Sequence, residues 1–373
     1  MRIMDDDLHA AAIHVARMAT SPLALDHYRL LGRSGLRVSP LSLGTMTFGT
    51  DWGWGADEAE ARRMFDRYVD RGGNFIDTAN QYTNGSSEQL VGAFAEGRRD
   101  RLVLATKYTI STRQGDPNAG GNHRKSMVRS LETSLQRLRT DYLDILYLHA
   151  WDALTPVDEI MRAFDDLVRA GKLLYIAISD APAWQVARMQ MLAELRGWAP
   201  FVALQIAYNL IERTVERDLI PMARELGIGV IPWSPLASGV LTGKYSRADL
   251  DAGAGTASAA GTRKNVAASN GALTERGLAI AGEVVGVARE LGRTPSQVAL
   301  AWTLLEPAVT SPIIGARTLA QLDDNLGALD VVFSADQRAR LDRASAIELG
   351  FPHDFLNKPM ARGLMFGGTT VRR

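Results

Sequence analysis

The chain of 373 residues contains no cysteine. This absence excludes disulfide bonds, thiol catalysis and every metal or iron–sulfur site that needs cysteine ligands. No sign of charge dominates either, because 42 basic side chains balance 42 acidic ones. A chain without net charge has no field that would hold nucleic acid or an anionic lipid surface. We therefore expect neither a nucleic acid nor a membrane as the main partner.

Long apolar runs are also missing, since none approaches the roughly 20 residues that a membrane-spanning helix needs. The first 18 residues carry three aspartates and lack the apolar centre of a secretory signal. With 46% hydrophobic and 23% charged residues, the composition is that of an ordinary globular protein. These features predict a soluble cytoplasmic protein whose chemistry uses oxygen and nitrogen groups or a bound cofactor.

The chain divides into three parts. An Ala-rich amphipathic stretch from Leu8 to Met18 ends at Pro22, and its pattern does not continue. We interpret residues 1–26 as a poorly ordered extension, with a docking helix as the alternative. Residues 27–350 then form one domain, and residues 351–373 form a C-terminal tail.

A regular alternation of apolar runs and helical patterns follows a hairpin signal at residues 28–38. The apolar runs are continuous, which indicates parallel strands buried on both faces. The predicted strands are 41–45, 74–77, 102–107, 143–149, 174–179, 203–208, 229–233 and 310–314. The predicted helices are 57–72, 86–96, 122–139, 156–170, 183–196, 216–226, 278–306 and 318–327.

Eight such units predict a single (β/α)8 TIM barrel with an N-terminal β-hairpin and an additional C-terminal helix at 334–345. The competing fold is an open doubly wound sheet that binds dinucleotides. It is disfavoured because no G-x-G-x-x-G motif follows the first strand. The small-residue segment 253–261 contains G-x-G, but no strand precedes it, and we interpret it as a loop.

Four polar residues stand at or just past the C-terminal ends of three consecutive predicted strands, where such barrels carry their active sites. Asp77 ends the second strand and Tyr82 follows five residues later, while Lys107 and His149 end the third and fourth strands. Neighbouring strands lie roughly 4.8 Å apart, so these side chains can converge.

The four side chains suit proton donation to an oxygen. A free tyrosine titrates near pH ~10, an adjacent ammonium lowers that pKa, and a carboxylate keeps the lysine charged. A histidine can position a carbonyl oxygen against the tyrosine, so the set favours hydride addition to C=O or the reverse. Taken singly, the aspartate could be a helix cap and the lysine a solvated strand end, so the argument depends on their joint placement.

Longer segments carry a resemblance to a known family: GGNFIDTANQY (72–82), LATKY (104–108), LDILYLHAWD (143–152), WSPLASGVLTGKY (233–245) and GARTLAQLDDNLGAL (315–329). They resemble the aldo-keto reductases over roughly residues 28–345. The open loop around 239–277 resembles the prokaryotic-type branch of that family. The resemblance implies that Asp77, Tyr82, Lys107 and His149 are a catalytic tetrad, with Tyr82 as the general acid.

The resemblance also implies an extended NADPH or NADP⁺ across the barrel top, and no metal. Trp233 matches the aromatic side chain that stacks on the nicotinamide, with a core tryptophan as the alternative. The other implied cofactor residues are Gly44, Thr45, Met46, Asp77, Ser179, Asp180 and Gln205 near the nicotinamide, Ser234, Pro235, Leu236, Gly239, Leu241 and Lys244 at the pyrophosphate, and Gly315, Ala316, Arg317, Gln321, Asp324 and Asn325 at the adenosine end.

Two of these positions set further expectations. Many family members carry Ser-Asn where this chain has Ser179-Asp180, and an ionised aspartate can only accept hydrogen bonds. Arg317 predicts a preference for NADPH, because a guanidinium can bind two oxygens of a 2′-phosphate. The alternative for Arg317 is a solvated arginine that pairs with Asp323 or Asp324.

The sequence therefore predicts an NADP-dependent aldo-keto reductase of the alcohol dehydrogenase or carbonyl reductase class, which reversibly reduces an aldehyde or ketone. Trp52, Trp54 and Trp151 predict an apolar substrate pocket, unless they pack loops onto the barrel. A non-catalytic NADP(H)-binding subunit of the potassium-channel β-subunit type is the main alternative function. A metal-dependent barrel hydrolase is disfavoured, because carboxylate–histidine clusters are missing from the strand ends. The substrate and the oligomeric state cannot be read from the sequence.

Overall fold

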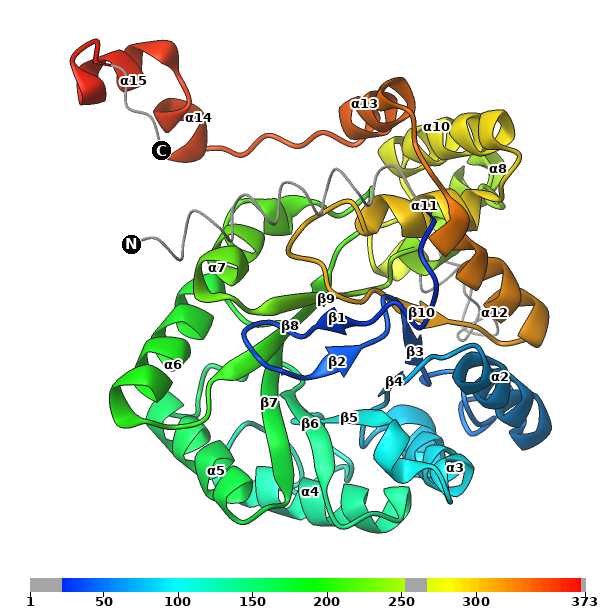
Figure 1. Cartoon of the computed structure of the whole chain (residues 1–373), viewed down its shortest axis with the longest axis vertical. Coiled ribbons are helices and arrows are strands. Elements are labelled where there is room, and N and C mark those ends of the chain that lie inside the picture. The colour runs from blue at the N-terminus through cyan, green and yellow to red at the C-terminus, as the bar shows by residue number, and fades with distance from the viewer. Residues whose placement is uncertain (1–21, 252–266, 370–373) are drawn as a thin grey trace.

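The computed structural model of the chain describes residues 22–251 and 267–369, which form a barrel surrounded by helices (Figure 1). Eight parallel strands lie in the order β10-β3-β4-β5-β6-β7-β8-β9. The backbone N–H of Val230 donates to the carbonyl of Ala308, and the N–H of Thr310 donates to the carbonyl of Val230, both at 2.8 Å. These bonds join β9 to the segment that leads into β10. The predicted TIM barrel is confirmed.

Every predicted strand and helix of the barrel is present, with bounds that overlap the predicted ranges. The strands are β3 (Ser42–Gly44), β4 (Phe75–Asp77), β5 (Val103–Tyr108), β6 (Leu143–Leu148), β7 (Leu173–Ser179), β8 (Phe201–Ala207), β9 (Gly229–Trp233) and β10 (Ile313–Gly315). The helices are α2 (Glu58–Asp70), α3 (Ser86–Ala95), α4 (Arg124–Leu138), α5 (Val157–Arg169), α6 (Ala183–Arg196), α7 (Leu219–Leu226), α8 (Arg247–Asp251), α10 (Glu275–Leu291), α11 (Pro295–Thr303), α12 (Leu319–Leu326) and α13 (Ala335–Ala344).

One predicted helix, 278–306, is two helices in the structure. Gly292 ends α10 in the left-handed conformation (φ 62°), which glycine adopts without steric cost. Thr294 then caps α11, and its side chain and that of Gln297 accept hydrogen bonds from each other's backbone N–H groups. Pro295 stands at the first helical position, where its missing N–H costs nothing.

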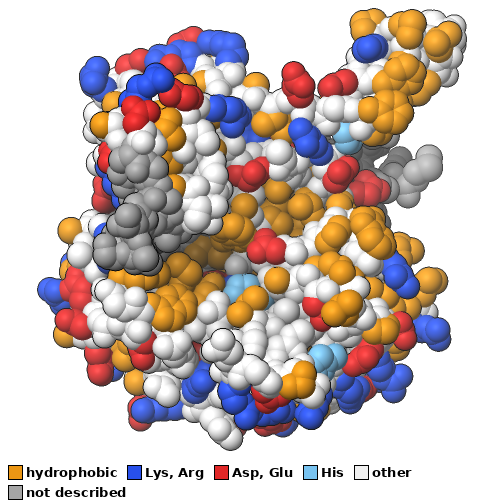
Figure 2. Space-filling view, turned by 180° about the vertical axis from the view of Figure 1, so that it is seen from behind, with side chains coloured by type: hydrophobic (Ala, Val, Ile, Leu, Met, Phe, Trp, Pro, Cys, Tyr) orange, Lys and Arg blue, Asp and Glu red, His pale blue; other side chains and the backbone are white. Residues whose placement is uncertain are grey.

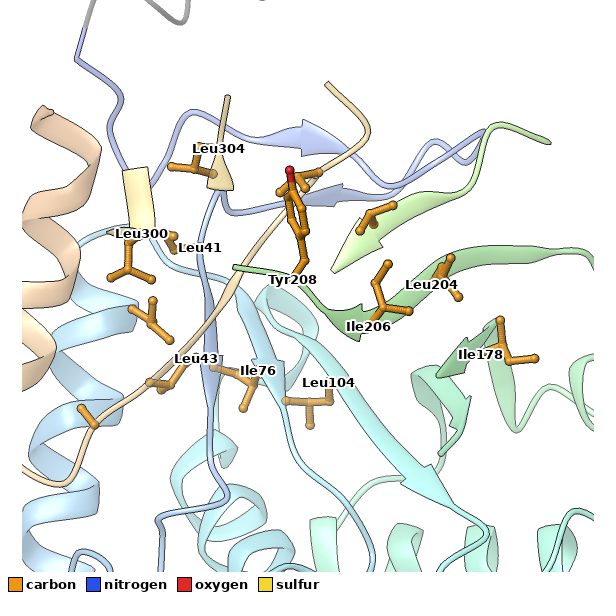
Figure 3. Packing of buried hydrophobic residues seen from close by; sticks show 14 of the residues in the cluster. Leu41, Leu43, Ile76, Leu104, Ile178, Leu204, Ile206, Tyr208, Leu300 and Leu304 are labelled. Carbon is orange, nitrogen blue, oxygen red and sulfur yellow. The ribbon is translucent and has the colours of Figure 1, made fainter. Parts of the chain in front are cut away.

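The core has two parts. An inner cluster fills the barrel, and the hairpin of β1 (Arg29–Leu30) and β2 (Arg37–Val38) closes its N-terminal end with Leu31 and Val38. A larger outer cluster lies between the strands and the helices, where Leu43, Ile76 and Leu104 of neighbouring strands lie in a row (Figure 3). Continuous apolar strands are needed because both faces of the sheet are buried.

The ends of the chain differ in how they contact the barrel. Residues 1–21 of the predicted extension and the segment 253–261 lie outside the described residues. From Leu23 onward the chain packs on the barrel, since Leu23 donates to the carbonyl of Leu329 (2.8 Å) and Leu25 is buried. After α13, the tail runs away from the barrel to α14 (His353–Leu356) and α15 (Pro359–Phe366), as Figure 1 shows. None of the helices described is long and apolar enough to span a membrane.

Candidate active site

The strand period of two residues explains why polar side chains meet at one end of the barrel. Side chains alternate between the two faces of a strand, so the residue two positions after an inward residue also points inward. Six residues of the inner cluster are followed in this way by a predicted site residue. The pairs are Phe75 and Asp77, Ala105 and Lys107, Tyr147 and His149, Ala177 and Ser179, Ala203 and Gln205, and Ile231 and Trp233.

Lys107 lies at the centre of this group and is fully buried. Its Nζ donates to Asp77 Oδ1 (2.5 Å), to the Thr78 carbonyl (2.8 Å) and to the Tyr82 hydroxyl (3.2 Å). Gln205 Nε2 donates to the other oxygen of Asp77 (2.9 Å). The ammonium and the carboxylate thus compensate each other's charge, and their remaining hydrogen-bonding groups are largely satisfied.

Burial and charge act in opposite directions on these groups. Burial alone would lower the pKa of Lys107, but the negative charge of Asp77 raises it above its ordinary value. Burial raises the pKa of Tyr82, although the charge of Lys107 opposes this. The expected lowering of the Tyr82 pKa is therefore wrong in its net direction. At neutral pH, Tyr82 keeps its proton and Lys107 stays charged.

His149 completes the group of four side chains. Its ring lies edge-on to the ring of Tyr82, with 6.0 Å between the centroids. Burial, together with the positive charge of Lys107, lowers the pKa of His149 to about 3. The imidazole is therefore neutral and carries one N–H that can donate to a ligand oxygen.

A strained turn holds Tyr82 in place. Tyr82 begins a short 3₁₀ segment, η1 (Tyr82–Gly85), in which Thr83 has φ 45° and Asn84 has φ 55°. A β-branched residue with positive φ is rare, and strain of this kind persists only where the surroundings enforce it. Thr83 Oγ1 donates to the Phe48 carbonyl (2.7 Å) and accepts from the Ser87 N–H (3.0 Å). These bonds fix the turn that aims Tyr82 at Lys107.

A cavity of about 690 Å³ begins at Tyr82 and His149, which form its inner end, and runs toward α12, which lies at its outer end. Figure 2 looks at the face opposite the hairpin and shows it hollowed near its centre, with hydrophobic side chains in the hollow. The predicted site residues that line the cavity are Gly44, Met46, Asp77, Tyr82, His149, Ser179, Asp180, Gln205, Trp233, Ser234, Pro235, Leu236, Gly239, Lys244, Gly315, Ala316, Arg317, Gln321, Asp324 and Asn325.

Three residues of the predicted site lie behind the cavity wall. Lys107 lies behind Asp77 and Tyr82, to both of which it donates a hydrogen bond. Thr45 is fully buried and donates to the Asp77 carbonyl (3.0 Å). Leu241 is buried in the outer core. Thr45 therefore fixes the backbone of Asp77 without facing the cavity, and Leu241 packs beneath the loop that follows β9.

Asp180, which follows β7, and Trp233, which ends β9, are linked across the end of β8. Trp233 Nε1 donates to Asp180 Oδ1 (3.0 Å), and Asp180 has a positive φ of 43°. Burial raises the pKa of Asp180 above its ordinary value. The carboxylate of Asp180 thus holds the indole ring of Trp233 in place.

At the outer end of the cavity, Arg317 is exposed and makes no ion pair with any residue that the structure describes. Neither of its suggested acidic partners takes that role. Asp323 accepts from Arg67 Nη1 (2.7 and 2.8 Å), and Asp324 accepts from Thr294 Oγ1 (2.9 Å). The guanidinium of Arg317 is available to a ligand.

The three tryptophans predicted to line a substrate pocket lie outside the lining of this cavity. Trp52 is nevertheless edge-on to Tyr82, with 6.5 Å between the centroids, and Trp54 lies 5.7 Å from Trp52. Trp151 is half-buried against the outer core. Of the three, Trp52 is the one whose ring packs edge-on against Tyr82.

Sequence reasoning missed nine lining residues. Some are neighbours of predicted ones, whereas Asn270 and Ser296 come from segments with no sequence signal of a binding site. The missed residues are Thr47, Gln81, Ser238, Thr242, Asn270, Ser296, Leu300, Ile313 and Ile314. No group of three or more His, Asp or Glu side chains with metal-binding geometry occurs in residues 22–251 and 267–369.

Comparison with known proteins identifies the family of the chain. A sequence profile described as Aldo/keto reductase family matches residues 40–346. Norsolorinic acid reductase of Aspergillus flavus is 36% identical, with 90% of this chain and 85% of the relative aligned. The uncharacterized oxidoreductase YrpG of Bacillus subtilis is 41% identical, with coverage of 82% and 91%. The aryl-alcohol dehydrogenase [NADP(+)] of Phanerodontia chrysosporium is 35% identical, with 88% of each chain covered. The chain belongs to the aldo/keto reductase family.

Proposed function

We propose that the chain is an NADPH-dependent oxidoreductase that reduces an aldehyde or ketone to the alcohol, reversibly, with Tyr82 as the proton donor. The contact of Lys107 Nζ with both Asp77 (2.5 Å) and the Tyr82 hydroxyl (3.2 Å), at the inner end of a large cavity, carries this proposal. The name of the Phanerodontia relative, an aryl-alcohol dehydrogenase that uses NADP⁺, agrees with the cofactor and the reaction class.

The lining residues fit a nicotinamide dinucleotide. The hydroxyl of Ser179 is buried without a hydrogen bond to any described residue, and an amide group would satisfy it. A Cβ at Gly44 would come within 2.5 Å of Ile313 Cγ2, so glycine lets β3 and β10 pack closely where both line the cavity. Gly239 has φ 89°, and its missing Cβ leaves room for the ammonium of Lys244, which brings a positive charge to the cavity wall.

The outer end of the cavity supports a preference for NADPH over NADH. Arg317 has no ionic partner among the described residues, and Thr318 caps α12, whose N-terminus adds positive potential. A 2′-phosphate placed there would gain a guanidinium partner that NADH cannot use. Asp323 pairs with Arg67, which reduces its repulsion of a phosphate.

The side chains of the inner end would carry the proton transfer. A nicotinamide held in the cavity would supply the hydride for the carbonyl carbon. The neutral imidazole of His149 donates a hydrogen bond to the carbonyl oxygen and holds it near Tyr82. The Tyr82 hydroxyl then transfers its proton to that oxygen, and the ammonium of Lys107 stabilises the phenolate that remains. Asp77 keeps Lys107 charged and fixed throughout.

Turnover of 4-nitrobenzaldehyde by the purified chain with NADPH tests this proposal. We expect oxidation of NADPH together with formation of one equivalent of alcohol. Binding of NADPH without turnover of any compound in a panel of aldehydes, ketones and sugars would instead favour a regulatory subunit. That outcome would contradict the catalytic part of the proposal and leave the cofactor part standing.

A further inference from the structure

The C-terminal arm, residues 351–369, exposes an unusual amount of apolar surface. It holds seven of the fifteen exposed large hydrophobic side chains among the described residues. Phe351 is 86% exposed, Leu364 77% and Met360 63%. Since a large side chain presents roughly 150–250 Å², the arm exposes on the order of 700 Å² of apolar area. The largest apolar patch of a typical monomer is only about 300–600 Å².

The base of the arm is attached to the barrel, but the arm itself is not. Arg217 Nη2 donates to the Glu348 carbonyl (2.7 Å), and His353 Nε2 lies 3.5 Å from Asp218 Oδ1. Beyond this point only Ala361 is buried. The arm stands clear of the barrel in Figure 1, and hydrophobic side chains cover it in Figure 2. The attachment therefore directs the apolar surface away from the molecule that carries it.

An apolar groove opens beside the base of the arm. It has a volume of about 640 Å³ and lies between α6 and the start of α7. Asp218, which contacts His353 of the arm, lines it. The apolar residues used here are Trp184, Ala187, Val215, Leu219 and Met222, and Trp184 is 64% exposed.

We propose that the arm of one molecule docks in this groove of a second copy of the chain, and the reverse, as a two-fold dimer. A two-fold interface requires that each molecule carry both complementary surfaces, and here they adjoin at Asp218. Met360 and Leu364, four residues apart on α15, form one ridge that fits an apolar groove. If half of the apolar area of each arm is buried together with an equal area of the surface that receives it, the two contacts bury on the order of 1,400 Å², within the roughly 1,200–2,000 Å² of stable interfaces.

Crosslinking tests whether the arm of one chain lies in the groove of another. Because the chain has no cysteine, only the introduced thiols can react. Ala187→Cys is introduced in the groove of one chain and Leu364→Cys in the arm of another. The two are mixed when dilute so that subunits exchange, then concentrated and treated with a short thiol–thiol crosslinker. We expect a covalent heterodimer that carries both substitutions.

Leu195→Cys is the matched control for the groove. It lies on the same helix, is 78% exposed and is outside the groove, so it should give no heterodimer with Leu364→Cys. A chain with both Ala187→Cys and Leu364→Cys that crosslinks only within itself would assign the groove to its own arm. That result, or no crosslink between the mixed chains, would overturn the proposal.

Sedimentation equilibrium supplies an independent measurement. The wild type should be a dimer at micromolar concentration, and Met360→Asp with Leu364→Asp should raise the dimer dissociation constant at least tenfold. Leu195→Asp should leave it unchanged. A wild type that stays monomeric over the whole range would overturn the proposal. So would a monomer whose arm instead carries it onto phosphatidylcholine–phosphatidylglycerol vesicles in a flotation assay.

Discussion

The two ends of the cavity use positive charge in opposite ways. At the inner end, Lys107 is fully buried and donates to Asp77, Thr78 and Tyr82. At the outer end, Arg317 is exposed and has no ionic partner among the residues described. A charge that is already paired inside the protein fixes geometry and pKa values. A charge left without a partner at the surface is available to a ligand.

The difference in burial also separates stability from binding. Removal of one partner from a buried pair leaves an uncompensated charge and costs several kcal/mol. Removal of an exposed, unpaired charge changes the free energy of unfolding by roughly 0.5 kcal/mol at most. The inner end should therefore be sensitive in both stability and turnover, and the outer end only in its choice of cofactor.

Tyr82→Phe should have the largest effect, because it removes the proton donor and little else. Loss of general acid catalysis typically costs about 10²–10⁴-fold in rate. We expect kcat for a saturating aldehyde to fall by that factor, while the dissociation constant of NADPH, measured by fluorescence, stays within about twofold. Near-normal kcat would show that the inner end does not act through Tyr82.

Lys107→Met should destabilise the fold by about 3–5 kcal/mol, because it leaves the buried Asp77 without its ion-pair partner. Urea unfolding measures this change. The double variant with Asp77→Asn should recover part of the loss, since it removes the uncompensated charge. Arg317→Ala is the control for the outer end and should unfold like the wild type.

The inner end was predictable because each strand is a short apolar run that ends at a polar residue. The position of Asp77, Lys107 and His149 follows from where the runs stop, and the period of two residues supplies the direction of each side chain. The place of Tyr82 was not predictable in the same way. The position of the Tyr82 ring depends on the left-handed backbone at Thr83, which no sequence pattern predicts.

Other features needed tertiary structure. Asn270 reaches the cavity from the segment before α10 and Ser296 from the first turn of α11, which no local pattern indicates. The break between α10 and α11 was available in the sequence, since Gly292 and the Thr294–Pro295 pair are a helix end and a helix start. The direction of the pKa shift of Tyr82 could be found only from the structure, because burial of the side chain raises the pKa by more than the charge of Lys107 lowers it.

Acid should destabilise the protein through His149 before the carboxylates are fully protonated. The folded pKa of His149 is lowered to about 3, below the roughly 6.5 of an unfolded histidine. In this pH range the unfolded chain therefore binds a proton that the folded chain does not bind, and stability is lost as the pH falls from about 6.5 toward 3. His149→Gln should make the urea midpoint less dependent on pH in that window. An unchanged dependence would mean that the imidazole is protonated in the folded state.

Arg317→Ala should remove the preference for NADPH over NADH. Hydrogen bonds to charged groups contribute about 1.5–3 kcal/mol, and 1.4 kcal/mol is a factor of ten. We expect a preference of roughly 10–100-fold in kcat/KM for the wild type, nearer the lower figure because Arg317 is exposed. High salt should reduce it further. A wild-type ratio near one, or a ratio that survives the substitution, would exclude Arg317 as the ligand of the 2′-phosphate.

Trp151→Ala should have the smallest effect and should distinguish a substrate contact from loop packing. Trp151 is half-buried against the outer core, and its N–H donates to the Asp180 carbonyl (3.3 Å), next to the cavity but outside its lining. Partial loss of an apolar contact should raise KM for bulky aromatic or alicyclic ketones by up to about tenfold, with small aldehydes nearly unaffected. Trp198→Ala, which removes a half-buried indole on the outside of the barrel, should leave both KM values unchanged. An equal rise of KM for both substrate classes in Trp151→Ala would assign Trp151 to packing the loop that carries it onto the barrel.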